Sequence, residues 1–290
     1  MKNVYVVFIL SIVMTHAILV SAHASQEDQQ DSNAYVQPNN LILHGEFTQG
    51  ALIRGKLPQG SEAKLNDKPL DIAQSGDFVF GFGRDAKLSH TLAYKMPNQN
   101  WQKKEIKLDQ RTYDIQKIEG VAQKYVSPPE EVLQRIRNDN RQIANARAAF
   151  SDNLYFTQSF VMPSKGRISG VYGSQRYFNG EPRRPHFGLD IANKTGTPVL
   201  APADGIIRLA HDDMYYSGGT LIMDHGFGVT STFIHLNKIH VKNGQKVKQG
   251  DLIADIGATG RVTGPHLDWR INWYKERLDP ALLVELNTQP

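Results

Sequence analysis

The stretch that most constrains this chain is GPHLDW, residues 264–269, close to the C-terminus. In an extended strand, side chains two apart leave the same face roughly 6.6 Å from each other. His266 and Asp268 can therefore both lean over one small site. That spacing suits a metal ion and its water.

A second stretch, PHFGLD, lies about eighty residues earlier and carries His186 and Asp190. In a straight strand these two side chains would stand roughly 13 Å apart, too far to share one metal. We therefore expect the chain to bend between them, and Gly188 permits a bend. Histidine and carboxylate groups, as three protein ligands with one open position, are what a catalytic zinc requires. The two stretches together predict a zinc hydrolase.

The first 24 residues predict export. Lys2 is followed by an apolar run from Val4 to Val20 and then by Ala22-His23-Ala24. This is the pattern of a secretory signal, and we expect cleavage after Ala24. The alternative is an uncleaved anchor that tethers the chain to the membrane, for which the apolar run is short and interrupted. We expect no other segment to cross a bilayer.

The sequence contains no cysteine. In an oxidising compartment this excludes disulfides, thiol nucleophiles and thiolate metal ligands, so nitrogen and oxygen would have to hold a metal. The chain has 33 basic and 29 acidic residues, or 32 and 29 once Lys2 leaves with the signal. Such a mild excess favours contact with anionic surfaces, but it is far from the charge of a nucleic-acid-binding protein.

The mature chain divides into segments that differ in composition and in their pattern of apolar residues, and we expect a mainly β fold. Residues 25–40 are polar and predict a disordered lead-in. Residues 41–118 show short alternating runs punctuated by glycine and Asn-Asp turns, which predict a small β-sandwich-like domain. Residues 159–290 again show short runs typical of strands, with glycine more frequent between them. About eight short strands there predict a compact antiparallel β domain.

Residues 119–158 predict a linker that contains one connector helix. Ser127-Pro128-Pro129-Glu130 is a capping box with proline in the first turn. Apolar residues follow at helical spacing: Leu133, Ile136, Ile143 and Phe150. Arginines occupy the other faces: Arg135, Arg137, Arg141 and Arg147. We expect the helix to pack against a neighbouring domain, although its arginines leave open a contact with an acidic polymer.

One more histidine lies on a predicted strand of the C-terminal domain. Alternation places Ser231, Phe233 and His235 on one face, opposite a second set of side chains. His235 is therefore presented singly on an otherwise ordinary strand.

Several motifs of the C-terminal domain occur together in one order. They are His186-x-x-x-Asp190, Gly196-Thr197-Pro198-Val199 with Ala203-Asp204-Gly205, Phe233-Ile234-His235-Leu236, Val247-Lys248-Gln249-Gly250, and Gly257-Ala258-Thr259-Gly260 running to Gly264-Pro265-His266-Leu267. In these motifs, Phe160 to about Pro280 resembles the lysostaphin-type (LytM-like) zinc metallopeptidases, which cut peptide cross-links in bacterial cell walls. Each motif alone is weak, and together they are specific.

The resemblance implies a role for individual residues. His186 and Asp190 correspond to two zinc ligands of the family, and His235 and His266 correspond to its catalytic histidines. The family's third zinc ligand is the second histidine of an HxH motif. In this sequence that position is Asp268.

The aspartate at this position is a departure from the family. Carboxylate oxygen is an acceptable zinc ligand, so a His-Asp-Asp site is chemically possible. A second carboxylate should weaken the pull of the metal on the proton of its bound water. The alternative is that Asp268 pairs with Arg270 or another arginine and that the metal has been lost. We do not expect His211, His225 or His240 to replace the missing ligand.

The resemblance implies an exported, periplasmic zinc metalloendopeptidase that hydrolyses peptidoglycan stem peptides or cross-links. Zinc would polarise the scissile carbonyl, one of His235 and His266 would take the proton of the water, and the other would steady the oxyanion. The expected partners are peptidoglycan peptides and no nucleic acid. The alternative is a non-catalytic relative that recruits or activates another wall hydrolase. Neither the bond cut nor the oligomeric state follows from the sequence.

Overall fold

The structure is a computed structural model of the 290-residue chain, and it describes residues 35–36, 40–119, 129–178, 180–182 and 184–285. These residues belong to one compact unit, Asn33–Pro290. The predicted signal, residues 1–24, lies outside the described residues. Among the described helices, none is long and apolar enough to span a membrane.

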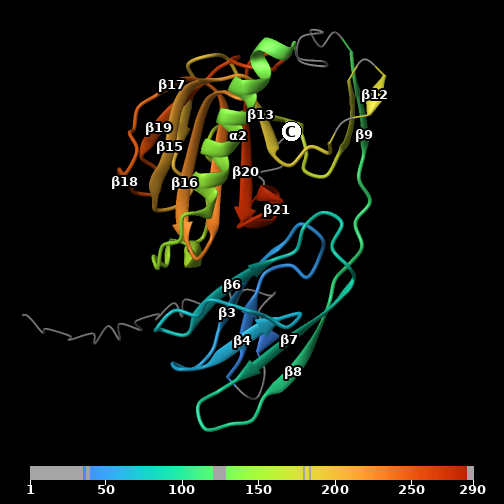
Figure 1. The fold of residues 1–290 in the computed structure, drawn as a ribbon, viewed down its shortest axis with the longest axis vertical. Coiled ribbons are helices and arrows are strands. Elements are labelled where there is room, and N and C mark those ends of the chain that lie inside the picture. Colours follow the sequence, from blue (N-terminus) through green and yellow to red (C-terminus); the bar gives the residue numbers. More distant parts are fainter. Residues whose placement is uncertain (1–34, 37–39, 120–128, 179, 183, 286–290) are drawn as a thin grey trace, which may run out of the picture. The chain divides into compact units, whose positions relative to one another are not determined.

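Two four-stranded antiparallel sheets form the N-terminal part, as predicted for a β-sandwich-like fold (Figure 1). One sheet contains, in spatial order, β1 (Tyr35–Val36), β2 (Ile42–His44), β3 (Leu52–Lys56) and β6 (Asp77–Gly81). The other contains β5 (Lys68–Pro69), β4 (Glu62–Leu65), β7 (Ser89–Lys95) and β8 (Gln102–Lys107). Both contribute to one apolar core that includes the fully buried Phe78, Phe80 and Leu92.

Strand β1 corrects part of the predicted disordered lead-in over residues 25–40. Tyr35 pairs with Leu43 and Val36 with Ile42, in antiparallel register. An aromatic and a β-branched residue are typical strand formers, so this dipeptide extends the sheet at its edge although its neighbours are polar. Residues 25–34 and 37–39 lie outside the described residues.

One helix connects the two β regions. A 3₁₀ turn, η1 (Glu130–Val132), leads into α2 (Leu133–Ala148). Ser127 of the predicted capping box lies outside the described residues, and Phe150, two residues past the helix end, is 52% exposed. Ile143 and Ala146 pack on a small apolar cluster of β15 and β16, as we expected of a packing helix (Figure 1).

A larger antiparallel sheet forms the C-terminal part. In spatial order it contains β10 (Arg167–Gly170), β13 (Leu189–Ala192), β20 (His266–Trp273), β17 (Val229–Ile239), β16 (Gly218–Gly226), β15 (Gly205–Met214) and β18 (Lys246–Val247). Three short strands pair alongside: β21 (Glu276–Leu278) with β20, β19 (Leu252–Ile256) with β17, and β14 (Pro198–Leu200) with β19. The 3₁₀ turns η2 (Tyr155–Thr157) and η3 (Pro280–Leu283) flank this sheet.

The two faces of this sheet differ in chemistry. On β20, Leu267, Trp269 and Ile271 are fully buried in the main apolar core. The alternate residues of β20 point the other way, and we call this surface the polar face: His266, Asp268, Arg270 and Asn272. Helix α2 packs against the same side, because Ile222 of its apolar cluster pairs with Thr232, which pairs with Arg270.

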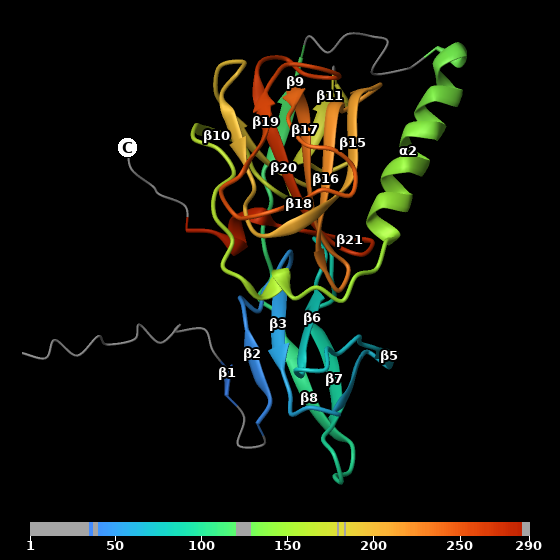
Figure 2. The same cartoon turned by 90° about the vertical axis from the view of Figure 1, so that its left-hand side faces the viewer.

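The two β regions also meet along their boundary. Leu52 and Val79, from strands of the sandwich, are 3% exposed and belong to the apolar core of the large sheet. Strand β9 (Ile115–Ile118) runs parallel to β11 (Gln175–Phe178), which pairs in turn with β12 (Glu181–Pro182) (Figures 1 and 2). The chain that leaves the sandwich thus supports the segment just before His186.

Candidate metal centre

The structure brings His186, Asp190 and Asp268 together. One ligand atom from each lies within 4.8 Å of the other two, and all three side chains are buried. His186 Nε2 is 3.0 Å from Asp190 Oδ1, and His186 Nδ1 is 4.0 Å from Asp268 Oδ2. The two sequence stretches therefore converge on one cluster of nitrogen and oxygen donors.

Strand pairing and one turn of the chain create this convergence. Asp190 on β13 lies directly opposite Asp268 on β20. His186 stands before β13, where its amide donates to Ser174 O at 2.8 Å and its carbonyl accepts from the amide of Gly173 at 2.7 Å. His186 thus approaches the two carboxylates from a segment outside β13. Because the chain turns between His186 and Asp190, the two side chains are not held apart as they would be in a straight strand.

Glycine is needed next to both carboxylates for steric reasons. Gly188 does not adopt a left-handed φ, but a Cβ there would lie 2.0 Å from Asp268 Oδ1. A Cβ at Gly170 would lie 2.2 Å from Asp190 Oδ2. We expected Gly188 to permit a bend, whereas the structure shows that it leaves room for a carboxylate.

His235 and His266 lie beside this cluster, with ring centroids 4.9 Å apart. Simple alternation is wrong at His235, because it would place this ring on the core side with Phe233. His235 has a left-handed φ of 67°, and its amide bonds to Ser217 O at 2.8 Å. This irregular conformation turns the ring toward His266 on the polar face.

Both histidines have one ring nitrogen facing a backbone carbonyl. His235 Nδ1 lies 2.9 Å from Thr259 O, and His266 Nδ1 lies 2.9 Å from Gly264 O. A carbonyl oxygen only accepts, so each Nδ1 carries the hydrogen and each Nε2 keeps a free lone pair. Burial lowers the pKa of His235 to about 4, so this ring is neutral at neutral pH. His266 Nε2 lies 4.0 Å from Asp190 Oδ1.

Asp268 pairs with Arg270, the partner named by one of our alternatives. Arg270 Nε donates to Oδ1 at 2.9 Å and Nη2 donates to Oδ2 at 2.6 Å. Burial opposes ionisation of Asp268, but the charges of Arg270 and His186 outweigh it and hold the pKa of this carboxyl well below its usual range. Each carboxylate oxygen retains a second lone pair, so the pairing leaves Asp268 able to bind a metal.

The donor set fits a zinc ion. Both ring nitrogens of His186 are buried, and neither has a hydrogen-bond partner among the described residues, since the approach to Asp190 Oδ1 has no hydrogen-bond geometry. Ligand atoms around a tetrahedral zinc lie about 3.3 Å apart. One donor atom from each residue lies within 4.8 Å of the other two, so the three side chains would close in by about an ångström or less to bind the ion. One histidine and two carboxylates supply the three protein ligands that a catalytic site uses.

The other histidines of the sheet lie in contacts of their own. His225 is fully buried, with its ring nitrogens 2.8 Å from Asp204 O and from Ser231 Oγ. His240 pairs with Asp255 at 3.0 Å. His211 accepts a bond from the amide of the residue two positions later. None of these three described histidines belongs to the donor cluster.

Residues 184–280 match peptidase family M23. The match covers all five residues of the cluster and its flanking histidines. The chain carries a peptidase family M23 domain. This confirms the resemblance to lysostaphin-type peptidases that the motifs indicated.

Curated relatives of the M23 domain include proteins named for cell-wall chemistry. The peptidoglycan DD-endopeptidase ShyA of Vibrio cholerae is 39% identical over 115 residues, which are 39% of this chain and 26% of ShyA. The cell division protein DipM of Caulobacter vibrioides is 34% identical over 131 residues, 43% of this chain and 21% of DipM. The chain therefore spans about a quarter of the length of these relatives.

One solved structure resembles this chain well beyond its M23 domain. A Pseudomonas aeruginosa protein assigned to peptidase M23 is 28% identical, with a TM-score of 0.63. The similarity covers 82% of this chain and 95% of that protein. Because residues 184–280 alone make up a third of the chain, the shared structure also includes much of what precedes the M23 domain.

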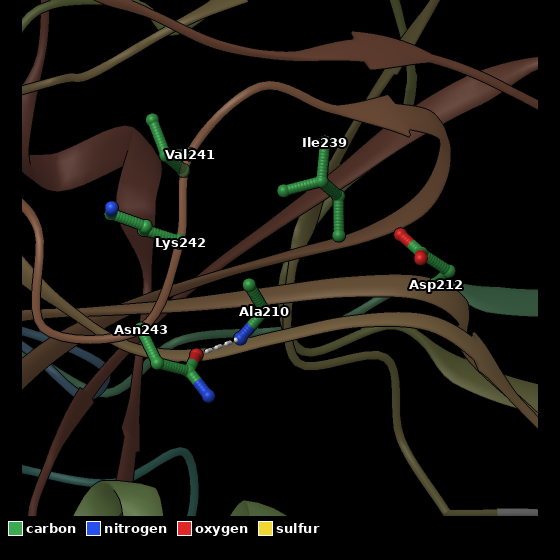
Figure 3. Close-up of a pocket in the computed structure, with 6 residues that line it drawn as sticks. All are labelled: Ala210, Asp212, Ile239, Val241, Lys242 and Asn243. Atoms are coloured by element: carbon green, nitrogen blue, oxygen red, sulfur yellow. Dashed lines mark hydrogen bonds between the residues drawn. The ribbon is translucent and has the colours of Figure 1, made fainter.

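A pocket elsewhere on the M23 domain contains no residue of the metal cluster. It is lined by residues of β15, the end of β17 and the loop that follows: Ala210, Asp212, Ile239, Val241, Lys242 and Asn243 (Figure 3). Asn243 Oδ1 accepts a hydrogen bond of 2.6 Å from the amide of Ala210. The side chain of Asn243 is thus engaged in holding the loop to β15.

Proposed function

We propose that this chain is an exported zinc endopeptidase that hydrolyses peptide bonds in peptidoglycan. The observation that supports this most is the buried cluster of three donors beside two histidines that each keep one basic nitrogen. The M23 match and the name of the Vibrio relative indicate the same class of reaction.

His186, Asp190 and Asp268 would hold the metal. A zinc ion bound there would supply Lewis acidity for the scissile carbonyl and would lower the pKa of a coordinated water. The three side chains are buried, so they are already placed for binding and lose little freedom when it occurs.

His235 and His266 would manage the proton and the developing charge. The Thr259 and Gly264 carbonyls hold both rings as the Nδ1–H tautomer, so either Nε2 can accept the proton of the attacking water. Once protonated, the same ring can donate a hydrogen bond to an oxyanion. The two rings stand side by side, which allows one to act as base while the other stabilises charge.

Arg270 would offset the extra negative charge of the aspartate ligand. A carboxylate in place of histidine adds one negative charge at the metal, and the guanidinium adds one positive charge within hydrogen-bond reach of it. The Asp268–Arg270 pair is neutral, as a histidine ligand is. We therefore expect the acidity of a zinc-bound water to be weakened less than an isolated aspartate would cause.

Export completes the proposal, because peptidoglycan lies outside the cytoplasm. The sequence pattern of residues 1–24 supports a secretory signal and a periplasmic location. The second candidate function is a binding or activating module without metal. The bidentate contact of Arg270 with Asp268 favours it, since the guanidinium occupies one lone pair on each carboxylate oxygen.

A cleavage assay separates the two candidates. The mature chain, loaded with zinc, is incubated with purified cross-linked peptidoglycan fragments, and the products are analysed by mass spectrometry with and without a chelator. We expect chelator-sensitive hydrolysis of a peptide bond. Fragments that bind but stay intact at every zinc concentration would favour the binding module.

A further inference from the structure

Three arginines gather on the polar face beyond the metal cluster. Arg270 follows Asp268 on the same strand face, and Arg277 on β21 lies directly opposite Asn272 of β20. Arg147, in the last turn of α2, reaches the sheet and donates from Nη2 to Thr232 Oγ1 at 3.1 Å. Because Thr232 lies opposite Arg270, the three guanidinium groups share one region of the sheet.

The positive charge of this cluster exceeds the negative charge that faces it. Asp268 is the acid that acts on both Arg147 and Arg277, and Arg270 already engages both of its oxygens. Burial, with repulsion from Arg277 and Arg270, lowers the pKa of Arg147 well below its usual range. Burial and repulsion from Arg270 likewise lower the pKa of Arg277 to about 10.

Asp190, opposite Asp268, also acts on Arg270, so three guanidinium groups face two carboxylates in this region. Asp224, a further acid on this face, does not balance the excess. It lies opposite Thr230 in the neighbouring strand and accepts two hydrogen bonds from Arg208, at 2.9 and 2.6 Å. Its other carboxylate oxygen accepts from the amide of Gly226 at 2.8 Å. Asp224 and Arg208 therefore balance each other.

Several buried polar atoms in the same region have no hydrogen-bond partner among the described residues. They are Arg147 Nε, Arg277 Nη1, Thr230 Oγ1 and Asn272 Oδ1. Thr230 is 0% exposed and Asn272 is 1% exposed, whereas Arg147 and Arg277 are only partly buried, so the cluster reaches the surface through its two arginines. Buried polar atoms are rarely left unpaired, and two unpaired guanidinium N–H groups require an acceptor.

We propose that Arg147 and Arg277 bind a carboxylate of the peptide substrate. A guanidinium presents its N–H groups in a planar fork that matches a carboxylate, and such charge-assisted bonds are the strong ones. A carboxylate would also supply the negative charge that the arginine cluster lacks.

The position of this site along the sheet defines which carboxylate it takes. Arg270 stands two residues beyond Asp268, and Asn272, opposite Arg277, stands four beyond, which corresponds to about 6.6 to 13 Å along the strand. An extended peptide advances about 3.3–3.6 Å per residue. The site therefore suits a carboxylate about two to four residues from the scissile bond, an assignment that rests on the proposed function.

Ordered water is the competing explanation for the unpaired atoms. Water bridging Arg147 Nε and Arg277 Nη1 to Asn272 Oδ1 would satisfy all of them without any ligand. Water carries no charge, however, and the mutual repulsion of the arginines would remain. The two explanations differ in whether the site prefers an anion.

The test measures binding of a cross-linked peptidoglycan peptide with free carboxyl groups and of the same peptide with carboxamides in their place. The full mature chain is titrated calorimetrically in the presence of a chelator, so that neither hydrolysis nor a carboxylate–zinc contact contributes. We expect the free-acid peptide to bind at least about tenfold more tightly, the usual effect of a charge-assisted hydrogen bond. Arg147→Gln and Arg277→Gln should each remove most of this preference.

Two controls keep the outcome specific. Arg137→Gln removes an arginine of the same helix whose hydrogen bonds go to Gln134, one turn away, and it should keep the preference. Arg277→Lys retains the positive charge but not the planar guanidinium, and it should keep part of the preference for the free-acid peptide. Thermal unfolding confirms that each variant is folded.

Equal binding of both peptides by the wild type would overturn the proposal and leave a hydrated polar cluster only. A preference that survives Arg147→Gln and Arg277→Gln together would overturn it as well. Failure of the proposed function looks different, since the zinc-loaded chain would then cleave neither peptide while the binding preference persisted.

Discussion

The two β regions of this chain are built from similar short strands but bury different side chains. In the described residues 40–119, the buried polar side chains are Thr48, Gln49 and Ser61, and no acid, base or histidine is buried. Among the described residues of the C-terminal region, eight acids and histidines are buried: His186, Asp190, Asp204, Asp224, His225, His235, Asp268 and Asp279. Burying such groups is costly unless they are paired, so the C-terminal region is where the side chains capable of chemistry are concentrated.

Pairing further separates structural from functional charge within the C-terminal region. Asp224 has Arg208 on one oxygen and a backbone amide on the other, with no contact to the donor cluster. Asp268 has one guanidinium bond on each oxygen and lies 4.0 Å from His186. Asp224 is fully paired within the protein and therefore stabilises the fold. Asp268 retains one lone pair on each oxygen, which a metal ligand needs.

Removal of a flanking histidine should give the largest effect. His235→Ala or His266→Ala should reduce cleavage of wall peptides by about a hundredfold or more, because a positioned acid or base contributes that much. Zinc content should stay near that of the wild type, since the three proposed ligands, His186, Asp190 and Asp268, are unchanged. Steady-state hydrolysis with elemental analysis checks both. Zinc loss in His235→Ala would show that the division of roles is wrong.

A core substitution in the sandwich should lower stability and leave zinc binding unchanged. Phe80 is fully buried in the sandwich core, and Phe80→Ala should lower the free energy of unfolding by about 3–5 kcal/mol. Zinc bound per folded chain should not change, because this core contains no ligand. Urea unfolding and zinc titration measure the two quantities. A parallel fall in zinc affinity would mean that the sandwich shapes the metal site.

Acid should destabilise the chain through its buried histidines. Burial lowers the pKa of His225 from 6.5 to about 4, so the folded state keeps this ring neutral while the unfolded state gains a proton. The stability is fully present above about pH 6.5 and is lost as pH falls toward 4. The loss for one such group is about 3 kcal/mol. Unfolding measured across this range should show it, and His225→Gln should flatten the dependence; an unchanged slope would contradict it.

The Asp268–Arg270 pair should behave as one unit. Asp268→His alone leaves the partly buried guanidinium without its carboxylate, and Arg270→Gln alone leaves the carboxylate without its guanidinium. Each should lower the free energy of unfolding by about 2 kcal/mol. The double variant should recover most of this loss and bind zinc more tightly than Asp268→His alone. Unfolding in chelator, followed by zinc titration, measures the coupling. Additive losses would mean that the two side chains act independently.

Sequence motifs predicted the site better than local periodicity did. The family resemblance carried by PHFGLD and GPHLDW implied that His186, Asp190 and Asp268 lie together, and the structure brings their donor atoms within 4.8 Å of one another. Spacing alone indicated only that the chain must bend between His186 and Asp190. Alternation was wrong at His235, because one left-handed residue turns its ring, and a periodic pattern contains no signal for that.

Tertiary contacts explain the remaining gaps. A helical period assigns Arg147 to a face of the helix without showing that it reaches Thr232 on a distant strand. We expected Gly188 to matter because glycine allows the chain to bend. Its second role, leaving space beside Asp268, depends on strand register and became visible only in the structure. From the sequence, Arg270 was one expected partner of Asp268. The sequence did not indicate that Arg270 offsets the negative charge of this carboxylate.

Locating the metal tests directly whether His186, Asp190 and Asp268 bind zinc. Crystals of the mature chain grown with zinc are measured just above and just below the zinc absorption edge, together with crystals of His186→Ala. We expect one anomalous peak about 2.0–2.2 Å from donor atoms of His186, Asp190 and Asp268, and no such peak in the variant. A wild-type map without a peak there, with Asp268 still bound to Arg270, would contradict it.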